Sequence, residues 1–372
     1  MNTSEASVPP GPLAWAPPLT PRPPRPRWVW LAIPIALLTV IAVVAAFVGL
    51  PYYTIGPGSA RSVSTLVRVE GAPTYPPHGK VLFTTVSVGP VRNVYQAIDG
   101  WLDPSVDVIA KDRVTGGKST REYEQESLQD MVDSKQEAEV VALRKLGYNV
   151  TEHGQGAVVV ATRPELNAGA KDLTVGDVVI AADGARVALA ADLVAIIQRH
   201  KPGDQLRLSV RSGDLATPPH DITVGVGHRK DGTPLLGVNL ATLHAGFDFP
   251  IKVDIESGDV GGPSAGLAFT LALLDVLTPG ELTGGVPVAA TGTMDSDGVV
   301  GPIGGMAQKI VTVKRAGAKV FLVPAEEYAE AKAHAGKLTI VKVHTIDDAL
   351  AALSRIKGSN ALALGRPGGA PR

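Results

Sequence analysis

Ser264 and Lys309 are the side chains of this sequence whose surroundings best suit a nucleophile and its base. Ser264 lies in GGPSAGLAFTLALLDVL, where the apolar run predicts a buried helix over Ser264–Leu277 that ends at Pro279 and Gly280. A helix N-terminus presents unpaired backbone N–H groups and the positive end of the helix dipole, which can stabilise an oxyanion. Serine is also a favoured helix N-cap, and this stretch taken alone favours the cap over the nucleophile.

Lys309 lies near the start of a second predicted helix. The segment GPIGGMAQKIVTVKRAG predicts this helix over Met306–Ala316, after two glycines. Apolar neighbours on one helical face would desolvate the lysine ammonium and lower its pKa toward the range of a general base. These neighbours are Ile303, Met306, Ile310 and Val313. Lysine is more often a solvated surface charge, so Lys309 taken alone would be interpreted that way.

Taken together, the two segments resemble the proteolytic domain of the Lon family of serine–lysine peptidases. The matching motifs are GGPSAG around the serine, GPIGGMAQKI around the lysine, and the Thr-Gly pair at 291–292. The serine and the lysine are 45 residues apart (309 − 264), close to the spacing in that family. The resemblance spans residues 237–353. It implies that Ser264 is the nucleophile, Lys309 the general base and Thr291 the residue that orients the lysine, with no metal and no cofactor.

The sequence departs from the Lon pattern in two ways. Cytoplasmic Lon enzymes carry an ATPase module that is not found in this sequence, which implies ATP-independent cleavage of unfolded, flexible or pre-cut substrates. Many members also have aspartate three residues before the serine, where this sequence has Gly261. That difference leaves the oxyanion geometry and the level of activity open. We assign Gly262, in the same loop, to substrate binding.

A second resemblance covers residues 152–227. The segment GDVVIAADGARV, with the predicted strand AVVVAT before it and the alternating QLRLSVRS after it, resembles a PDZ domain of the HtrA type. Such domains bind an extended peptide at a sheet edge and hold its terminal carboxylate in a backbone nest. By analogy the nest lies near Gly154–Ala157, and Gly156, Ala157 and Val158 contact the peptide. The alternative is another small α/β module with the same Asp-Gly turn.

The first fifty residues predict a membrane anchor. Residues 1–27 are rich in proline and arginine, which predicts a disordered cytoplasmic tail. The run WVWLAIPIALLTVIAVVAAFVGL, Trp28 to Leu50, has no charge and is long enough for the roughly 30 Å hydrocarbon core. A cleaved signal peptide is the alternative, but its apolar region is usually only about 7–15 residues. The cluster of Arg22, Arg25 and Arg27 places the N-terminus inside and the rest of the chain outside the cytoplasmic membrane.

Composition excludes several classes of function. The formal net charge of −1 argues against a nucleic-acid-binding surface across the whole chain. The absence of cysteine excludes disulfides, thiolate nucleophiles and zinc–thiolate sites. The segment GGKST, residues 116–120, resembles part of a phosphate-binding loop. However, Asp112 stands where that motif requires its first glycine, so we predict no nucleotide site.

These features predict an α/β (α+β) protein with one N-terminal transmembrane helix, a PDZ-like domain and a Lon-type proteolytic domain. Residues 51–151 form an exported region whose strand GKVLFTTVSV could join the protease sheet, and residues 354–372 form a flexible tail. The arrangement resembles bacterial membrane-anchored Lon-like proteases with an inserted PDZ domain. The predicted partners are the lipid bilayer and protein or peptide substrates recruited by the PDZ domain, and a homo-oligomer is left open. The competing hypothesis is a non-catalytic membrane adaptor that displays a PDZ module on a degenerate protease scaffold.

Overall fold

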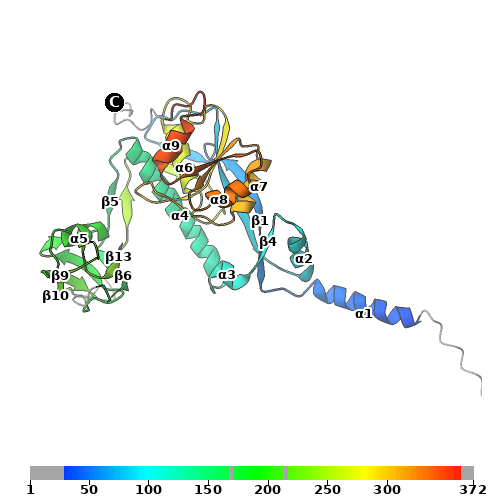
Figure 1. Ribbon diagram of the computed structural model, residues 1–372, viewed down its shortest axis with the longest axis horizontal. Coiled ribbons are helices and arrows are strands. Elements are labelled where there is room, and N and C mark those ends of the chain that lie inside the picture. Colours follow the sequence, from blue (N-terminus) through cyan, green and yellow to red (C-terminus); the bar gives the residue numbers. More distant parts are fainter. Residues whose placement is uncertain (1–28, 164, 167–170, 213–216, 362–372) are drawn as a thin grey trace, which may run out of the picture.

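The computed structural model describes residues 29–163, 165–166, 171–212 and 217–361 (Figure 1). The predicted cytoplasmic tail, Trp28, the arginine cluster and residues 362–372 of the predicted C-terminal tail lie outside the described residues.

A six-stranded mixed sheet forms the centre of the larger unit. Its strands lie in the order β20 (Thr339–Val343), β19 (Val320–Pro324), β16 (Pro287–Ala290), β3 (Lys80–Pro90), β1 (Tyr52–Ser62) and β4 (Asp107–Ala110). The pairs β20–β19, β19–β16 and β16–β3 are parallel, whereas β3–β1 and β1–β4 are antiparallel. The predicted strand GKVLFTTVSV is therefore β3, in the middle of the sheet that also contains the C-terminal strands.

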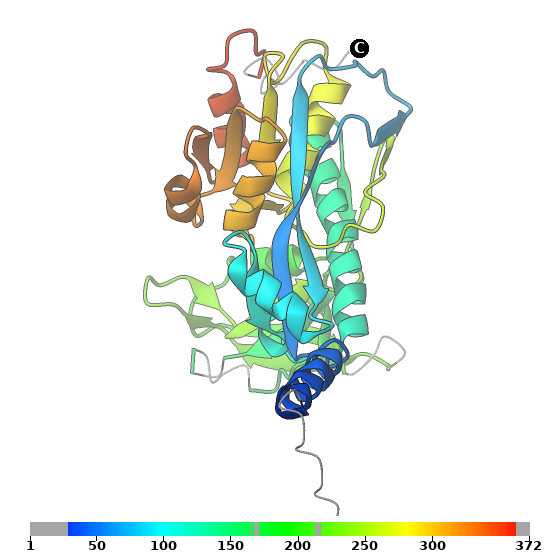
Figure 2. The same ribbon diagram turned by 90° about the vertical axis from the view of Figure 1, so that its right-hand side faces the viewer.

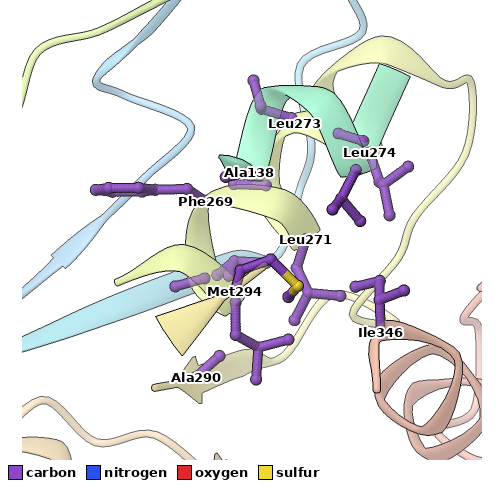
Figure 3. Close-up of a cluster of buried hydrophobic side chains, with 14 of the residues drawn as sticks. Ala138, Phe269, Leu271, Leu273, Leu274, Ala290, Met294 and Ile346 are labelled. Atoms are coloured by element: carbon purple, nitrogen blue, oxygen red, sulfur yellow. The ribbon is translucent and has the colours of Figure 1, made fainter. Parts of the chain in front are cut away.

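Helices cover both faces of this sheet, and its strands bury side chains in two directions. Leu82, in β3, packs in one core with α7 (Met306–Arg315) and α8 (Tyr328–His334). Its neighbour Phe83 packs in the other core with α4 (Thr120–Lys145), α6 (Gly266–Leu277) and α9 (Ile346–Leu353). Every residue of α6 is buried. Figure 3 shows its side chains between Ala138 of α4, Ala290 of β16 and Ile346 of α9.

The remaining elements of the larger unit are short, apart from α4. The long helix α4 begins with a capping box between Ser119 and Glu122. Two short helices, α2 (Val94–Leu102) and α3 (Lys111–Thr115), flank β4. Two-stranded ribbons pair β2 (Val67–Glu70) with β15 (Lys252–Ile255), and β17 (Thr293–Met294) with β18 (Val300–Gly301).

A smaller unit with its own core is inserted between the two halves of the larger one. Its sheet has the order β10 (His220–Gly225), β9 (Gln205–Arg211), β7 (Val178–Ala182), β6 (Ala157–Thr162) and β13 (Val238–Thr242), and β8 (Ala185–Arg186) pairs with β7. The helix α5 (Ala190–Ile197) packs on this sheet, and β11 (Gly227–His228) pairs with β12 (Pro234–Leu235). The connection to the larger unit is the antiparallel pair β5 (Thr151–His153) and β14 (Gly246–Asp248) (Figure 1).

The boundary between the two units differs from the sequence-based expectation. We expected the protease domain to begin at Gly237, but β13 pairs with β6 in the smaller sheet. The physical reason is apolar packing, because Val238 and Leu240 of β13 lie against the core of the smaller unit.

The helix α1 (Val29–Ala45) extends away from the larger unit (Figures 1 and 2). It is 17 residues long and ends before the predicted limit of the apolar run at Leu50. None of the helices in the described residues has both the length and the apolar character needed to cross a membrane.

Candidate active site

Ser264 lies immediately before the N-cap residue of α6. The N-cap is Ala265, and no side chain caps this helix. The predicted start of the helix at Ser264 is therefore wrong by two residues. The cause is the Ser264 carbonyl oxygen, which accepts hydrogen bonds from Thr291 Oγ1 (3.0 Å) and Gly292 N (3.0 Å) instead of from a helical N–H group. Within the described part of the chain the half-buried Ser264 hydroxyl makes no hydrogen bond, so it is not used as a cap.

The long helix α4 holds the loop that leads to Ser264. Gly262 N donates a hydrogen bond to Ser127 O (2.7 Å), and Ser134 Oγ donates one to Pro263 O (3.0 Å). A Cβ atom at Gly261 would lie 2.4 Å from Ser127 Oγ and 3.0 Å from Ser127 O. The close approach of α4 therefore leaves no space for an aspartate at 261, the residue that many Lon proteins have there.

Lys309 and Thr291 form a buried hydrogen-bonded pair beside the serine loop. Thr291 follows β16, and Lys309 lies in the first turn of α7. Lys309 Nζ donates a hydrogen bond to Thr291 Oγ1 (2.9 Å), whose own proton goes to the Ser264 carbonyl. Lys309 is 1% exposed and Thr291 is fully buried. The threonine thus connects the lysine amine to the backbone of the serine.

The surroundings of Lys309 favour its neutral form. Burial lowers the pKa of Lys309 to about 7, and the Glu327 carboxylate acts in the opposite direction. The predicted apolar neighbours Met306, Ile310 and Val313 are all buried, in agreement with the expected desolvation. An amine with this pKa is about half neutral at pH 7 and can accept a proton from a serine hydroxyl.

Glu327 is a residue of this site that the sequence analysis missed. It is the N-cap residue of α8, and its Oε1 accepts a hydrogen bond from Ile303 N (3.3 Å). Its Oε2 is buried and has no hydrogen-bond partner among the described residues. The only sequence signal is the Ala-Glu-Glu that follows β19, and two adjacent glutamates at a helix start are usually solvated.

The smaller unit does not present the predicted peptide-binding residues at a free edge. Residues 157–162 pair with β13 on one side, and Ala157 and Val158 pair with β7 on the other. Gly156 N donates to Ala188 O (3.0 Å), and Gly156 O accepts from Leu243 N (2.9 Å). The prediction of an open carboxylate nest near Gly154–Ala157 is therefore wrong. The backbone groups of Gly156 already form hydrogen bonds within the chain.

Comparisons with known proteins agree with the two-unit organisation. Residues 242–355 match the Lon protease (S16) C-terminal proteolytic domain, and residues 145–216 match the PDZ domain. The chain therefore carries a Lon-type proteolytic domain and a PDZ domain, as the two resemblances predicted. The class that this defines is a serine-type endopeptidase.

Relatives with curated names are Lon proteases. The Lon protease of Haemophilus influenzae is 35% identical over 119 residues, which is 31% of this chain and 14% of that protein. The Lon protease of Trichlorobacter lovleyi is 39% identical over 106 residues, 27% of this chain and 13% of that protein. This chain thus matches only a small part of the length of these relatives. Among solved structures, the PDZ domain of an SdrC-like protein from Listeria monocytogenes is 24% identical, with a TM-score of 0.21, over 23% of this chain and 87% of that one.

Proposed function

We propose that this protein is a membrane-tethered, ATP-independent serine endopeptidase with a Ser264–Lys309 dyad. The observation that carries the proposal is the buried chain from Lys309 Nζ through Thr291 Oγ1 to the Ser264 carbonyl. Ser264 Oγ attacks the peptide carbonyl and Lys309 takes the serine proton. The lysine then gives this proton to the leaving amine, and water hydrolyses the acyl-enzyme ester. The N-terminus of α6, directly after Ser264, supplies amide groups and a helix dipole for the oxyanion.

The substrates are unfolded, flexible or pre-cut proteins. In the described part of the chain, the residues ahead of the Lon-type domain form α1, strands of the protease sheet and the PDZ unit. In this proposal cleavage is not coupled to an ATPase. A substrate must then supply its own extended segment at Ser264.

Membrane tethering is the second part of the proposal. The large apolar side chains of α1 between Ile33 and Val44 are exposed, and Leu38 is 65% exposed. Water is an unfavourable surrounding for such a surface, whereas a lipid bilayer is a favourable one. The arginines before Trp28 favour an N-terminus inside and catalytic units outside the cytoplasmic membrane.

The PDZ unit recruits substrate C-termini in this proposal. Strand addition at β6 requires β13 to leave that edge, because an incoming peptide would use the same backbone groups. A peptide that adds at β6 therefore competes with an intramolecular strand, whereas the sheet edge on that side, among the described residues, lies at β13.

The test of the catalytic proposal is labelling of the full chain by a fluorophosphonate probe. We expect labelling of the wild type and of Ser87→Ala, an exposed serine in β3, and no labelling of Ser264→Ala. Cleavage of an unfolded protein should follow the same pattern. A wild-type chain that neither labels nor cleaves would favour the non-catalytic adaptor.

A further inference from the structure

The short helix α2 exposes its large apolar side chains and buries its small ones. Ala97 and Gly100 are the buried residues of this nine-residue helix. The exposed large apolar side chains are those of Tyr95, Ile98, Trp101 and Leu102. With 100° per residue these four lie on one continuous face, and the buried pair lies beside it on another side of the helix. The exposed fractions of Trp101 and Leu102 are 64% and 76%.

The packing of α2 on the sheet fixes this orientation. A Cβ atom at Gly100 would lie 2.8 Å from Val108 Cγ2 of β4 and 3.4 Å from Thr54 Cγ2 of β1. The helix therefore lies close against the sheet through its small residues and cannot rotate its large side chains inward. Asn93 caps the helix by accepting a hydrogen bond from Gln96 N (2.9 Å). The apolar face is thus a fixed feature of the surface.

The same helix lies at the C-terminal end of α1 (Figures 1 and 2). Tyr95 Oη donates a hydrogen bond to Ala42 O of α1 (2.7 Å). Leu50 N, in the segment after α1, donates one to Val91 O, just before α2 (3.3 Å). The exposed apolar face of α2 is therefore continuous with the exposed apolar surface of α1.

We propose that α2 lies in the membrane interface, with Tyr95, Ile98, Trp101 and Leu102 at the boundary between headgroups and acyl chains. This inference rests on the proposed anchoring by α1. Tryptophan and tyrosine are the residues that favour this boundary, and a short helix with one apolar face suits it. Continuity with α1 selects lipid over a second copy of the chain as the partner.

Interfacial binding of α2 would set the position of the catalytic groups relative to the bilayer. The helix packs on β4, and Asp107 at the start of β4 accepts a hydrogen bond from Gln308 Nε2 (2.8 Å), next to Lys309 on α7. A series of contacts therefore joins α2 to the helix that carries Lys309. Such an arrangement favours substrate segments that lie close to the outer face of the cytoplasmic membrane.

The test uses tryptophan fluorescence of the full chain in proteoliposomes. The chain has four tryptophans, so replacing Trp15, Trp28 and Trp30 by phenylalanine leaves Trp101 as the single reporter. The vesicles contain phosphatidylcholine brominated on the upper part of its acyl chains, and acrylamide is the quencher in water. We expect loss of Trp101 emission in brominated vesicles and little quenching by acrylamide. Ile98→Asp should reverse both effects, whereas Val175→Asp, an equally apolar exposed position in the smaller unit, should change neither.

A second reporter separates this inference from the anchor. Leu38→Trp in a chain without other tryptophans reports on α1 alone. If Leu38→Trp is quenched by brominated lipid and Trp101 is quenched only by acrylamide, α2 lies in water and the inference is wrong while the anchor stands. If Trp101 is shielded from both quenchers, protein covers the helix and lipid is the wrong partner. If neither reporter is quenched by lipid, the anchor and the inference fail together.

Discussion

The pH dependence of cleavage is the most direct consequence of the buried lysine. A solvent-exposed lysine has a pKa of about 10.4, so roughly one amine in 2,500 is neutral at pH 7. Burial lowers the pKa of Lys309 to about 7, where about half of the amines are neutral. The neutral fraction at pH 7 therefore rises by a factor of roughly 1,000, and the corresponding difference in free energy is about 4 kcal/mol.

We expect kcat/KM for a fluorogenic peptide to rise about tenfold per pH unit below pH 7 and to level off above it. Glu327→Gln provides the perturbation. The Glu327 carboxylate favours the ammonium form and raises the pKa of Lys309, so its loss should move the midpoint to lower pH. Glu326→Gln, at the exposed neighbouring position, should leave the midpoint unchanged. A midpoint near that of free lysine, or an upward movement in Glu327→Gln, would refute the assignment of Lys309 as base.

The same pKa predicts how stability changes with pH. Because the pKa of Lys309 is lower in the folded than in the unfolded chain, the unfolded chain binds more protons between about pH 7 and pH 10.4. The contribution of Lys309 to stability is therefore present above about pH 10.4 and is lost progressively as the pH falls from there to about 7. Methionine carries no charge, so the Lys309→Met variant should have a higher melting temperature than the wild type at pH 7. The difference in melting temperature should become small toward pH 10.

The remaining predictions concern the dyad, the orienting threonine, the strand β13 and the anchor. Lys309→Ala and Lys309→Arg should both abolish peptide cleavage while the fold survives, because arginine cannot lose its proton; near wild-type cleavage by the arginine variant would point to another base. Thr291→Val leaves the buried amine without its acceptor and should lower kcat about ten- to hundredfold, whereas Thr291→Ser should retain most activity in the same assay. Thr242→Val removes a hydrogen bond between β13 and α5. The rate of hydrogen exchange in β13 and the affinity for a free C-terminal peptide should then both increase roughly two- to tenfold. A decrease in both would contradict the proposal that β13 competes with the peptide for β6. Protease added to intact spheroplasts should digest residues 60–372 and spare the tail before Trp28, and protection of the C-terminal part would contradict the proposed orientation.

The sequence predicted the parts of the site that depend on local pattern. Met306–Ala316 has a clear apolar face, so its helix and the burial of its apolar residues could be inferred before the fold was known. Thr291 and Lys309 are brought together as the Lon resemblance implied. The start of α6 was misplaced because the carbonyl of Ser264 bonds to residues 27 and 28 positions later in the chain, which no local pattern reveals.

The other differences between prediction and structure arise from contacts between residues far apart in the sequence. The strand β13 has an apolar alternation that would suit either unit, and only its pairing with β6 assigns it to the smaller one. The role of α4 was also not visible, because a charged helix gives no sign that Ser127 and Ser134 hold the serine loop. Gly156 was interpreted as an open contact for a peptide. Its φ of 136° and the 2.8 Å from its would-be Cβ to Val178 Cγ1 show a tightly enclosed glycine, so a bulky residue there would damage the sheet.

The pairing of β3 with β16 has a consequence for the order of events during folding. Phe83 and Ala290 are register partners 207 residues apart (290 − 83), and the whole smaller unit lies between them in the chain. Contacts at such sequence separation form slowly, whereas the smaller unit can close its own sheet from neighbouring segments. Pulsed hydrogen exchange during refolding should therefore protect β7 and β9 before β16. Since Thr291 reaches Lys309 and the Ser264 backbone only once β16 has docked, we expect the buried Lys309–Thr291 pair to form late in folding, after the smaller unit has closed its own sheet.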